Sequence, residues 1–456
     1  MAVLRQYLSV AAIVQLLIEA AWFVTAVVLA VGLQRHGRGL SDGVLAPALL
    51  FAGILVVANG IAGLYRSDRG TPVGHFLSRA FGALAGGATV AYVLLLVVPG
   101  GRVYSGVLLE AAVLAFVGFV LLRKVVFARS NALANRVLVI GAGDDALAVE
   151  HALEGFRHGK PEIVGFYPIA GRDIAVPLDR VLHAAEPLNA ITRRLRATEI
   201  IVAVRDQRGG AVPMDQLLEC RLAGIPVQTM ETFYEKLRGR VPVDALKGSW
   251  LVYGNGFRQS SLRNFEKRAV DLAASLVLLA LGLPIMALAA IAIVLESGFP
   301  VFYRQERVGR GGQTFTVWKF RSMRTDAEAD GQARWAVKGD SRVTRVGRFM
   351  RKTRIDEMPQ LFNVLKGDMS LVGPRPERPT FVADLTKEIP FYNARHSVKP
   401  GVTGWAQVRY TYGASVEDAK KKLEYDLYYV KNHSLVLDLL ILLETVRVVL
   451  FQEGAH

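Results

Sequence analysis

The architecture of this chain depends most on residues 267–295, KRAVDLAASLVLLALGLPIMALAAIAIVL. Their apolar part is long enough to cross a bilayer, for which about 20 residues suffice. Gly282 and Pro284 lie in its middle, and proline removes a helix hydrogen bond and kinks the chain. Basic residues stand on both sides, and Lys and Arg favour the cytoplasmic face of a membrane. We therefore predict a broken, re-entrant helix that enters and leaves the same leaflet, with a kinked spanning helix as the alternative.

The first 130 residues are dominated by four apolar stretches, at 8–33, 44–65, 77–98 and 105–127. Each approaches or exceeds the roughly 20 residues that cross a bilayer, and short loops join them. We predict a bundle of four transmembrane helices over residues 1–130. The first stretch exceeds the roughly 7–15 residues of a signal-peptide core, so we interpret it as a retained helix.

Basic residues in the loops orient this bundle. The second loop and the end of the fourth helix carry more of them than the first and third loops. The residues compared are Arg66, Arg69, Arg79, Arg123, Lys124 and Arg129 against Arg35, Arg38 and Arg102. Both ends of the bundle are therefore predicted in the cytoplasm. Glu19 and Glu110 lie inside the apolar stretches with no visible partner, and a functional carboxylate and a bundle-facing or interfacial position both stay open.

A strand followed by a glycine-rich turn opens the middle of the chain. Residues 135–146, NRVLVIGAGDDA, place Gly141 and Gly143 where a helix N-terminus can meet phosphate. Further apolar runs alternate with helical segments, which predicts a small Rossmann-like α/β domain over residues 134–255. The acidic residue expected about 20 positions on is missing, because the second strand ends in Phe166-Tyr-Pro-Ile169. Packing without a dinucleotide and binding of a regulatory nucleotide both stay open.

The composition restricts the partners. The formal charge is +15 and 52% of the residues are hydrophobic. Beside membrane segments, lipid headgroups and phosphorylated substrates fit this charge better than nucleic acid, so we expect no nucleic-acid partner. Cys220 is the single cysteine, which excludes disulfides within the chain and Cys-rich metal sites.

The densest polar pattern is residues 353–376, TRIDEMPQLFNVLKGDMSLVGPRP. It predicts a short helix that begins at Asp356 and Glu357 and ends at Gly367. An Asp at the N-cap and a Glu in the first turn are ordinary stabilisers of a helix, which is the simplest interpretation of the pair.

The surroundings of the two carboxylates favour chemistry instead. Basic residues flank them in the sequence, and such a site attracts phosphate: Lys319, Arg321, Arg354 and Arg375. Mg²⁺ needs only one or two carboxylates plus phosphate oxygens, so Asp356 and Glu357 are candidate metal ligands. Gly373, Pro374 and Pro376 predict a rigid loop around an arginine that could bind phosphate through two nitrogens.

Residues 262–456 resemble the bacterial sugar transferase family, the polyprenyl-phosphate phosphoglycosyl transferases with one re-entrant catalytic helix. The resemblance rests on a dense series of motifs. They are Lys267-Arg-x-x-Asp271, Lys319-Phe-Arg321, Asp356-Glu357, Leu361 to Pro376, and Lys399-Pro-Gly-x-Thr-Gly-Trp405. The whole chain is similar to the large members that start exopolysaccharide or O-antigen assembly, and the exosortase-associated subgroup is the one we suggest.

The resemblance implies a reaction and its residues. Asp356 would attack the β-phosphorus of a UDP-sugar and release UMP, and undecaprenyl phosphate would then take the sugar phosphate. Glu357 would contact Mg²⁺, and Lys319, Arg321, Arg354 and Arg375 would bind phosphate. Asp368 would orient the site or stabilise the turn after Gly367.

The resemblance also implies a setting for this reaction. The enzyme would lie in the bacterial inner membrane, with an α-rich catalytic domain on the cytoplasmic side. It would bind membrane lipids and form a homodimer. The final apolar run, 435–451, is interrupted by charged residues and predicts an interfacial or packed helix.

Two other classes of function stay open. A membrane oxidoreductase would use the Gly141 turn, but it leaves the motifs after residue 300 unexplained. A membrane scaffold for polysaccharide export would tolerate the loss of Asp356. If Asp356 is an N-cap, replacing it by Asn should barely change stability.

Overall fold

The computed structural model describes residues 10–34, 43–65, 73–97, 106–123, 136–154, 161–169, 173–183, 186–204, 212–243, 260–327, 340–410, 413 and 415–451. The chain divides into two compact units, Met1–Leu237 and Arg238–His456. The three domain ranges 1–130, 134–255 and 262–456 stay a prediction. Residues just after the division contact the helix at 416–432, because Val241 N donates to Glu424 O at 3.0 Å.

Four apolar helices occupy the four predicted stretches: α2 (Val10–Gln34), α3 (Leu45–Ile61), α4 (Val73–Val97) and α6 (Leu108–Leu122). In α2 and α4, the segments Ile13–Gln34 and Phe76–Val97 are long and apolar enough to cross a membrane. The 17 residues of α3 and the 15 of α6 give lengths of about 25 and 23 Å. Both are shorter than a hydrocarbon core of about 30 Å. The chain is a membrane protein, and four complete spans stay a prediction.

The residues that orient the bundle lie mostly outside the described part of the chain. Those outside are Arg35, Arg38, Arg66, Arg69, Arg102, Lys124 and Arg129. The two carboxylates inside the apolar helices are described, and each has a partner that the sequence did not reveal. Glu19 is fully buried and accepts a hydrogen bond from Arg123 Nε at 2.9 Å. Glu110 accepts one from Gln34 Nε2 at 2.9 Å.

The middle of the chain forms the predicted alternation of strands and helices. Its elements are β1 (Arg136–Ile140), α7 (Asp144–Glu154), β2 (Glu162–Tyr167), η3 (Leu178–Arg180), α8 (Leu188–Arg194), β3 (Glu199–Val202), α9 (Met214–Leu222), β4 (Val227–Thr229) and α10 (Met230–Arg238). All four strands are parallel, in the order β2-β1-β3-β4. Two buried apolar clusters contain alternate residues of β1, Val137 and Val139 in one and Leu138 and Ile140 in the other. The strand is therefore apolar throughout, as a strand covered on both faces must be.

The second unit begins with the long helix α12 (Ser261–Ser297), followed by the antiparallel hairpin of β5 (Phe302–Val308) and β6 (Thr314–Phe320), joined by η5 (Arg310–Gly312). The remaining elements are α13 (Arg345–Thr353), η6 (Ile355–Glu357), α14 (Gln360–Lys366), β7 (Ser370–Val372), α15 (Pro379–Glu388), η7 (Tyr392–Ser397), β8 (Gly401–Thr403), α16 (Trp405–Arg409), α17 (Val416–Asn432) and α18 (Leu435–Phe451). Strands β7 and β8 pair in parallel. A helix over 435–451, as predicted, ends the unit.

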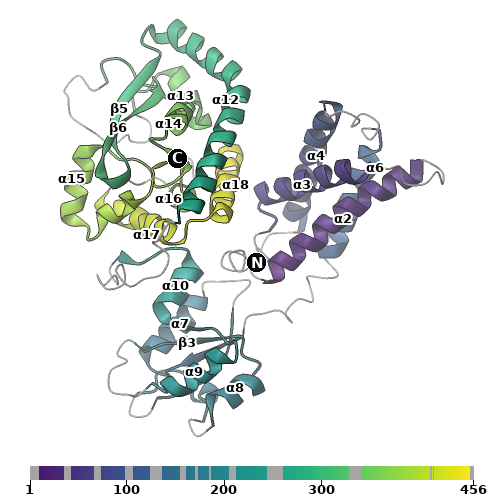
Figure 1. Cartoon of the computed structure of the whole chain (residues 1–456), viewed down its shortest axis with the longest axis vertical. Coiled ribbons are helices and arrows are strands. Elements are labelled where there is room, and N and C mark those ends of the chain that lie inside the picture. Colours follow the sequence, from purple (N-terminus) through teal and green to yellow (C-terminus); the bar gives the residue numbers. More distant parts are fainter. Residues whose placement is uncertain are drawn as a thin grey trace. The chain divides into compact units, whose positions relative to one another are not determined.

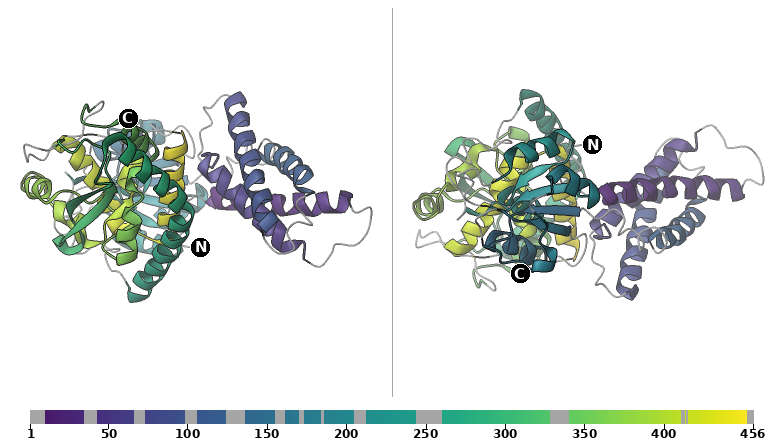
Figure 2. Two further views of the ribbon diagram at one scale, coloured as in Figure 1. Left: turned by 90° about the horizontal axis from the view of Figure 1, so that it is seen from above. Right: turned by 90° about the horizontal axis from the view of Figure 1, so that it is seen from below.

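Helix α12 lies along one side of this unit and bends along its length (Figures 1 and 2). One face packs against α13, η6, α14 and β7. The other exposes large apolar side chains, such as Leu281, Leu288 and Leu295. The helix continues through Gly282 and Pro284 without a loop, so these residues lie inside one bent helix. A re-entrant path stays a prediction.

Candidate active site

The two adjacent carboxylates lie in a tight turn between two helices. Helix α13 ends where Arg354 adopts a left-handed backbone, with φ of 60°. The 3₁₀ turn η6 then carries Asp356 and Glu357, closed by the hydrogen bond from Met358 N to Ile355 O at 3.1 Å. The capping interpretation is therefore wrong, because Pro359 stands at the N-cap of α14 and the carboxylates lie one turn earlier. The predicted end of the helix at Gly367 is confirmed, with φ of 100°.

Glu357 is the centre of a cluster of cations. Its Oε1 lies 3.0 Å from Lys319 Nζ and 3.0 Å from Arg375 Nη2, and its Oε2 lies 3.3 Å from Arg354 Nη1. Burial by itself would raise the pKa of Glu357, but Lys319, Arg375 and Arg354 together hold it well below its ordinary value. Glu357 is thus a permanent anion that gathers three of the four predicted phosphate-binding residues.

Asp356 has a different environment, although it is the next residue. Its side chain is 8% exposed, and its Oδ1 is buried with no hydrogen-bond partner among the described residues. Burial first, and then the charge of Glu357, raise the pKa of Asp356 to about 6. An ionised, poorly solvated carboxylate oxygen near three cations is the environment expected of a nucleophile toward phosphorus.

Arg321 does not join this cluster in the structure. Its Nη2 donates to Ser297 O at 2.8 Å, to Ser297 Oγ at 2.8 Å and to Gly298 O at 2.6 Å. These atoms form the end of α12, where unpaired carbonyls attract a cation. Its Nε and Nη1 are buried without a partner in the described part of the chain, so phosphate binding by Arg321 stays a prediction.

Gly373 in the motif Leu361–Pro376 and Gly404 in the motif Lys399–Trp405 allow the backbones of these two motifs to touch. A β-carbon at Gly373 would lie 2.3 Å from Lys399 O, and one at Gly404 would lie 2.1 Å from Gly373 O. Gly373 N donates to Thr403 O at 2.9 Å across the β7–β8 pair. This contact explains why glycine occurs in both motifs and places the loop of Pro374, Arg375 and Pro376 beside the second motif.

Asn363 is a positioning residue that the sequence analysis missed. Its Oδ1 accepts from Trp318 N at 3.1 Å and its Nδ2 donates to Thr316 O at 2.7 Å, as a neighbouring strand would. The amide therefore fastens α14 to β6 and brings Lys319 to Glu357. The signal available was a polar residue inside an apolar helical run, where a buried amide must find partners.

The first polar residues of α12 bind the second unit's own elements. Lys267 Nζ lies 2.7 Å from Asp438 Oδ2, and Asp271 Oδ1 accepts from Leu371 N at 3.2 Å. Arg268 donates to the carbonyls of Val364 and Leu365 at 2.5 and 2.7 Å. The motif thus anchors α12 to α14, β7 and α18.

Asp368 lies at the far end of α14 from Asp356. Its Oδ2 is 3.0 Å from Lys366 Nζ. An orienting role for Asp368 stays a prediction.

The described residues offer a divalent cation a small donor set. No group of three His, Cys, Asp or Glu side chains occurs among the residues that the structure describes. Asp356 and Glu357 supply two adjacent carboxylates, and Asp356 Oδ1 is unpaired. Mg²⁺ commonly takes one or two carboxylates and completes its shell with substrate phosphates and water, so this donor set fits it.

Close backbone contacts surround the Gly141 turn, and nucleotide binding there stays a prediction that the structure does not test. Ala142 O accepts from Ala175 N at 2.8 Å, and a β-carbon at Gly143 would lie 3.3 Å from Asp173 O, so residues 173–175 lie beside the turn. Asp144 and Asp145 begin α7, and their carboxylates would repel a phosphate at this helix end.

Residues 262–452 match the family described as bacterial sugar transferase. The chain is 48% identical over 240 residues to the UDP-N-acetylgalactosamine-undecaprenyl-phosphate N-acetylgalactosaminephosphotransferase of Aeromonas hydrophila, over 53% of this chain and 56% of the relative. It is 34% identical over 328 residues to the undecaprenyl-phosphate glucose phosphotransferase of Komagataeibacter xylinus, over 71% of this chain and 60% of the relative. The chain thus spans less than two thirds of these two relatives.

A shorter relative is matched over more of its length. The UDP-glucose:undecaprenyl-phosphate glucose-1-phosphate transferase of Caulobacter vibrioides is 44% identical over 195 residues, which cover 42% of this chain and 73% of the relative. The region 262–452, which matches the family, contains the Asp356–Glu357 turn, its three cations and the Gly373 loop. The chain belongs to the bacterial sugar transferase family.

Proposed function

We propose that this membrane protein transfers a sugar 1-phosphate from a UDP-sugar to undecaprenyl phosphate and releases UMP. The observation that carries the proposal is the unpaired, buried Oδ1 of Asp356 beside Glu357, which binds three cations. The relatives named as undecaprenyl-phosphate sugar phosphotransferases support the same reaction class. Such transfer would initiate the synthesis of an exopolysaccharide or a related glycan.

The reaction proceeds in two displacements at one phosphorus. Asp356 Oδ1 attacks the β-phosphorus of the UDP-sugar, and the bond from that phosphorus to the bridging oxygen breaks, so UMP leaves. An oxygen of undecaprenyl phosphate then attacks the same phosphorus and the bond to Oδ1 breaks. The products are the sugar-diphospho lipid and the free carboxylate. Two easier displacements replace one difficult one.

Electrostatics is the main problem, because an anion must approach an anion. Lys319, Arg354 and Arg375 lie around Glu357, and the two arginines are partly exposed, so their free nitrogens can bind phosphate oxygens. Asp356 and Glu357 would hold Mg²⁺, which when bound supplies further positive charge beside the phosphates. The cations also stabilise the ionised state of Asp356 against its burial.

The membrane arrangement is part of the proposal. The bend of α12 at Gly282 and Pro284 would return it to the cytoplasmic side, so the site meets lipid phosphate and soluble UDP-sugar at one boundary of the inner membrane. A homodimer is proposed as well. A cysteine introduced at the exposed Lys387 tests the path of α12. In intact cells a membrane-impermeant maleimide should leave it unlabelled, and full labelling from outside would contradict a re-entrant helix.

The covalent step is tested with Asp356→Asn. Asn keeps the size of the side chain but cannot attack phosphorus, so UMP release should fall by at least about 10³-fold. Asp384→Asn, at an exposed carboxylate on α15, is the matched control and should keep full activity. The assay contains undecaprenyl phosphate, Mg²⁺ and a panel of UDP-hexoses and UDP-N-acetylhexosamines. Undiminished UMP release by the Asp356 variant would refute covalent catalysis.

A scaffold function makes the opposite prediction in cells. A folded Asp356→Asn protein that restores polysaccharide in a deletion strain would favour a scaffold over an enzyme. An oxidoreductase that uses the Gly141 turn is disfavoured, because it leaves the motifs after residue 300 unexplained and because Asp144 and Asp145 at the start of α7 repel phosphate.

A further inference from the structure

The loop that carries Arg375 is fixed by its carbonyl groups. Each of its four successive carbonyls accepts a hydrogen bond from another part of the unit. The bonds are Gly401 N to Pro374 O at 2.9 Å, Arg395 Nη2 to Arg375 O at 2.9 Å, Arg307 Nη1 to Pro376 O at 3.0 Å, and Val308 N to Glu377 O at 2.9 Å. Two of the four donors are arginine side chains, which satisfy carbonyls that must find a partner when buried.

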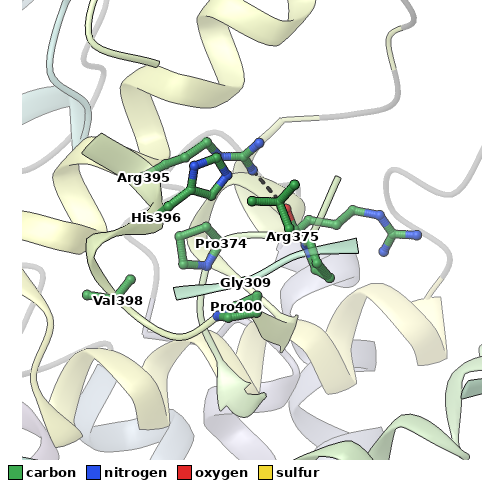
Figure 3. Close-up of a pocket in the computed structure, with 9 residues that line it drawn as sticks. Gly309, Pro374, Arg375, Arg395, His396, Val398 and Pro400 are labelled. Atoms are coloured by element: carbon green, nitrogen blue, oxygen red, sulfur yellow. Dashed lines mark hydrogen bonds between the residues drawn. The ribbon is translucent and has the colours of Figure 1, made fainter. Parts of the chain in front are cut away.

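Arg395 is the more deeply buried of these arginines, with a side chain 5% exposed. Its guanidinium has three partners in different directions. They are Asp426 Oδ2 at 2.8 Å, Tyr392 Oη at 2.6 Å and the carbonyl of Arg375. Figure 3 shows its hydrogen bond to Arg375 beside Pro374 and His396. Burying a guanidinium is costly, and these partners offset that cost, while its Nε has no hydrogen-bond partner among the described residues.

The hydrogen bond to the carbonyl of Arg375 helps to fix the backbone from which the side chain of Arg375 extends. A residue before proline is confined to extended backbone, so Pro376 already limits Arg375. A hydrogen bond to its carbonyl then selects one peptide orientation within that region. With the backbone fixed on both sides, the guanidinium of Arg375 reaches Glu357 at 3.0 Å while 37% of the side chain stays exposed.

We propose that Arg395 is a positioning residue, which acts through the carbonyl of Arg375 to hold the guanidinium of Arg375 where it binds a substrate phosphate. The phosphate-binding part rests on the function proposed above. Asp426 and Tyr392 keep the guanidinium of Arg395 in place. Lysine cannot replace it, because one ammonium lacks the planar fork that serves acceptors in different directions.

The experiment compares Arg395→Lys, Arg375→Lys and the double variant of the full chain in detergent. Arg395→Lys keeps a cation for Asp426, so the unit should fold. Arg342→Lys is the matched control, since Arg342 also pairs with a carboxylate, at 2.6 Å from Asp340, away from the loop. Hydrogen exchange of peptides covering 371–380 reports the loop, and UMP release reports the reaction.

We expect faster exchange in the loop of Arg395→Lys and no change in α14 or in the Arg342→Lys control. We expect kcat to fall about 10- to 100-fold, because a displaced binding group costs this much. Since Arg395 acts through Arg375, the double variant should be no more than about twofold slower than Arg375→Lys alone.

The outcomes separate this inference from the proposed function. Unchanged loop exchange in Arg395→Lys, or losses of kcat that multiply in the double variant, would overturn the positioning role. A wild-type protein that releases no UMP from any donor would refute the proposed function, while loop exchange would still decide whether Arg395 holds the loop.

Discussion

Replacing Asp356 by Asn should make the protein more stable at alkaline pH while abolishing its activity. Asp356 is buried, and its Oδ1 has no hydrogen-bond partner among the described residues. Burial and Glu357 penalise its ionised form, whereas Asn carries no charge. The N-cap argument from the sequence predicts no change in stability, so the two views give different results.

The magnitude follows from the pKa of Asp356. The difference between its ordinary value of 3.8 and about 6, at 1.36 kcal/mol per pKa unit, gives about 3 kcal/mol. Because the pKa is raised in the folded state, this free energy favours folding fully below pH 3.8 and is lost as the pH rises through 6. Asn avoids that loss, so the variant should gain up to about 3 kcal/mol at pH 8 and almost nothing at pH 4.

The assay is thermal unfolding of the full chain in one detergent at pH 8 and at pH 5. For a unit of this size, about 3 kcal/mol corresponds to roughly 6–12 °C in Tm. Asp384→Asn on the exposed face of α15 serves as the control and should shift Tm by less than about 1 °C at both pH values. A lower Tm of the Asp356 variant at pH 8, or an equal gain at pH 5, would refute the reasoning.

Further predictions concern pH, anchoring and backbone packing. The rate of UMP release should fall as the pH drops through about 6, because the attacking carboxylate of Asp356 becomes protonated; a rate that is flat from pH 8 to pH 5 would contradict this assignment. Asp438→Asn should lower the free energy of unfolding of the second unit by about 1–3 kcal/mol, since it leaves the partly buried Lys267 unpaired. The additional change Lys267→Met should recover part of that loss, as measured by chemical denaturation. Gly373→Ala should reduce the yield of folded protein, because a β-carbon there would lie 2.3 Å from a backbone oxygen. Gly86→Ala is the control, since Gly86 has open space around it, and it should give the normal yield of folded protein by size-exclusion chromatography.

The features that the sequence predicted correctly are local ones. Apolar runs of bilayer length became α2, α3, α4 and α6, although two are shorter than expected. The alternation of apolar runs and helical segments became a parallel sheet. Gly367 ends α14 because glycine adopts positive φ at low cost. Each of these depends on neighbouring residues and on general preferences of the chain.

The sequence predicted the residues of the candidate site but not their contacts in three dimensions. The basic residues around Asp356 and Glu357 were equivalent in the sequence, but Arg321 lies at the end of α12 while Lys319 reaches Glu357. β6 ends at Phe320, so Lys319 lies in the strand that Asn363 fastens to α14, whereas Arg321 lies beyond the end of that strand. Asn363 and Arg395 carried no catalytic signature, because their function is to hold other residues.

By itself, the sequence determined which segments are apolar, where strands and helices alternate and which polar residues cluster along the chain, since these follow from local composition and periodicity. Only the tertiary structure decided that Asp356 is buried without a partner, that Glu357 gathers three cations and that Arg395 holds the loop of Arg375. The physical reason is that burial and ion pairing depend on which elements pack together. Residues as far apart as Lys319 and Arg375 become neighbours only after β6, η6 and the loop after β7 meet.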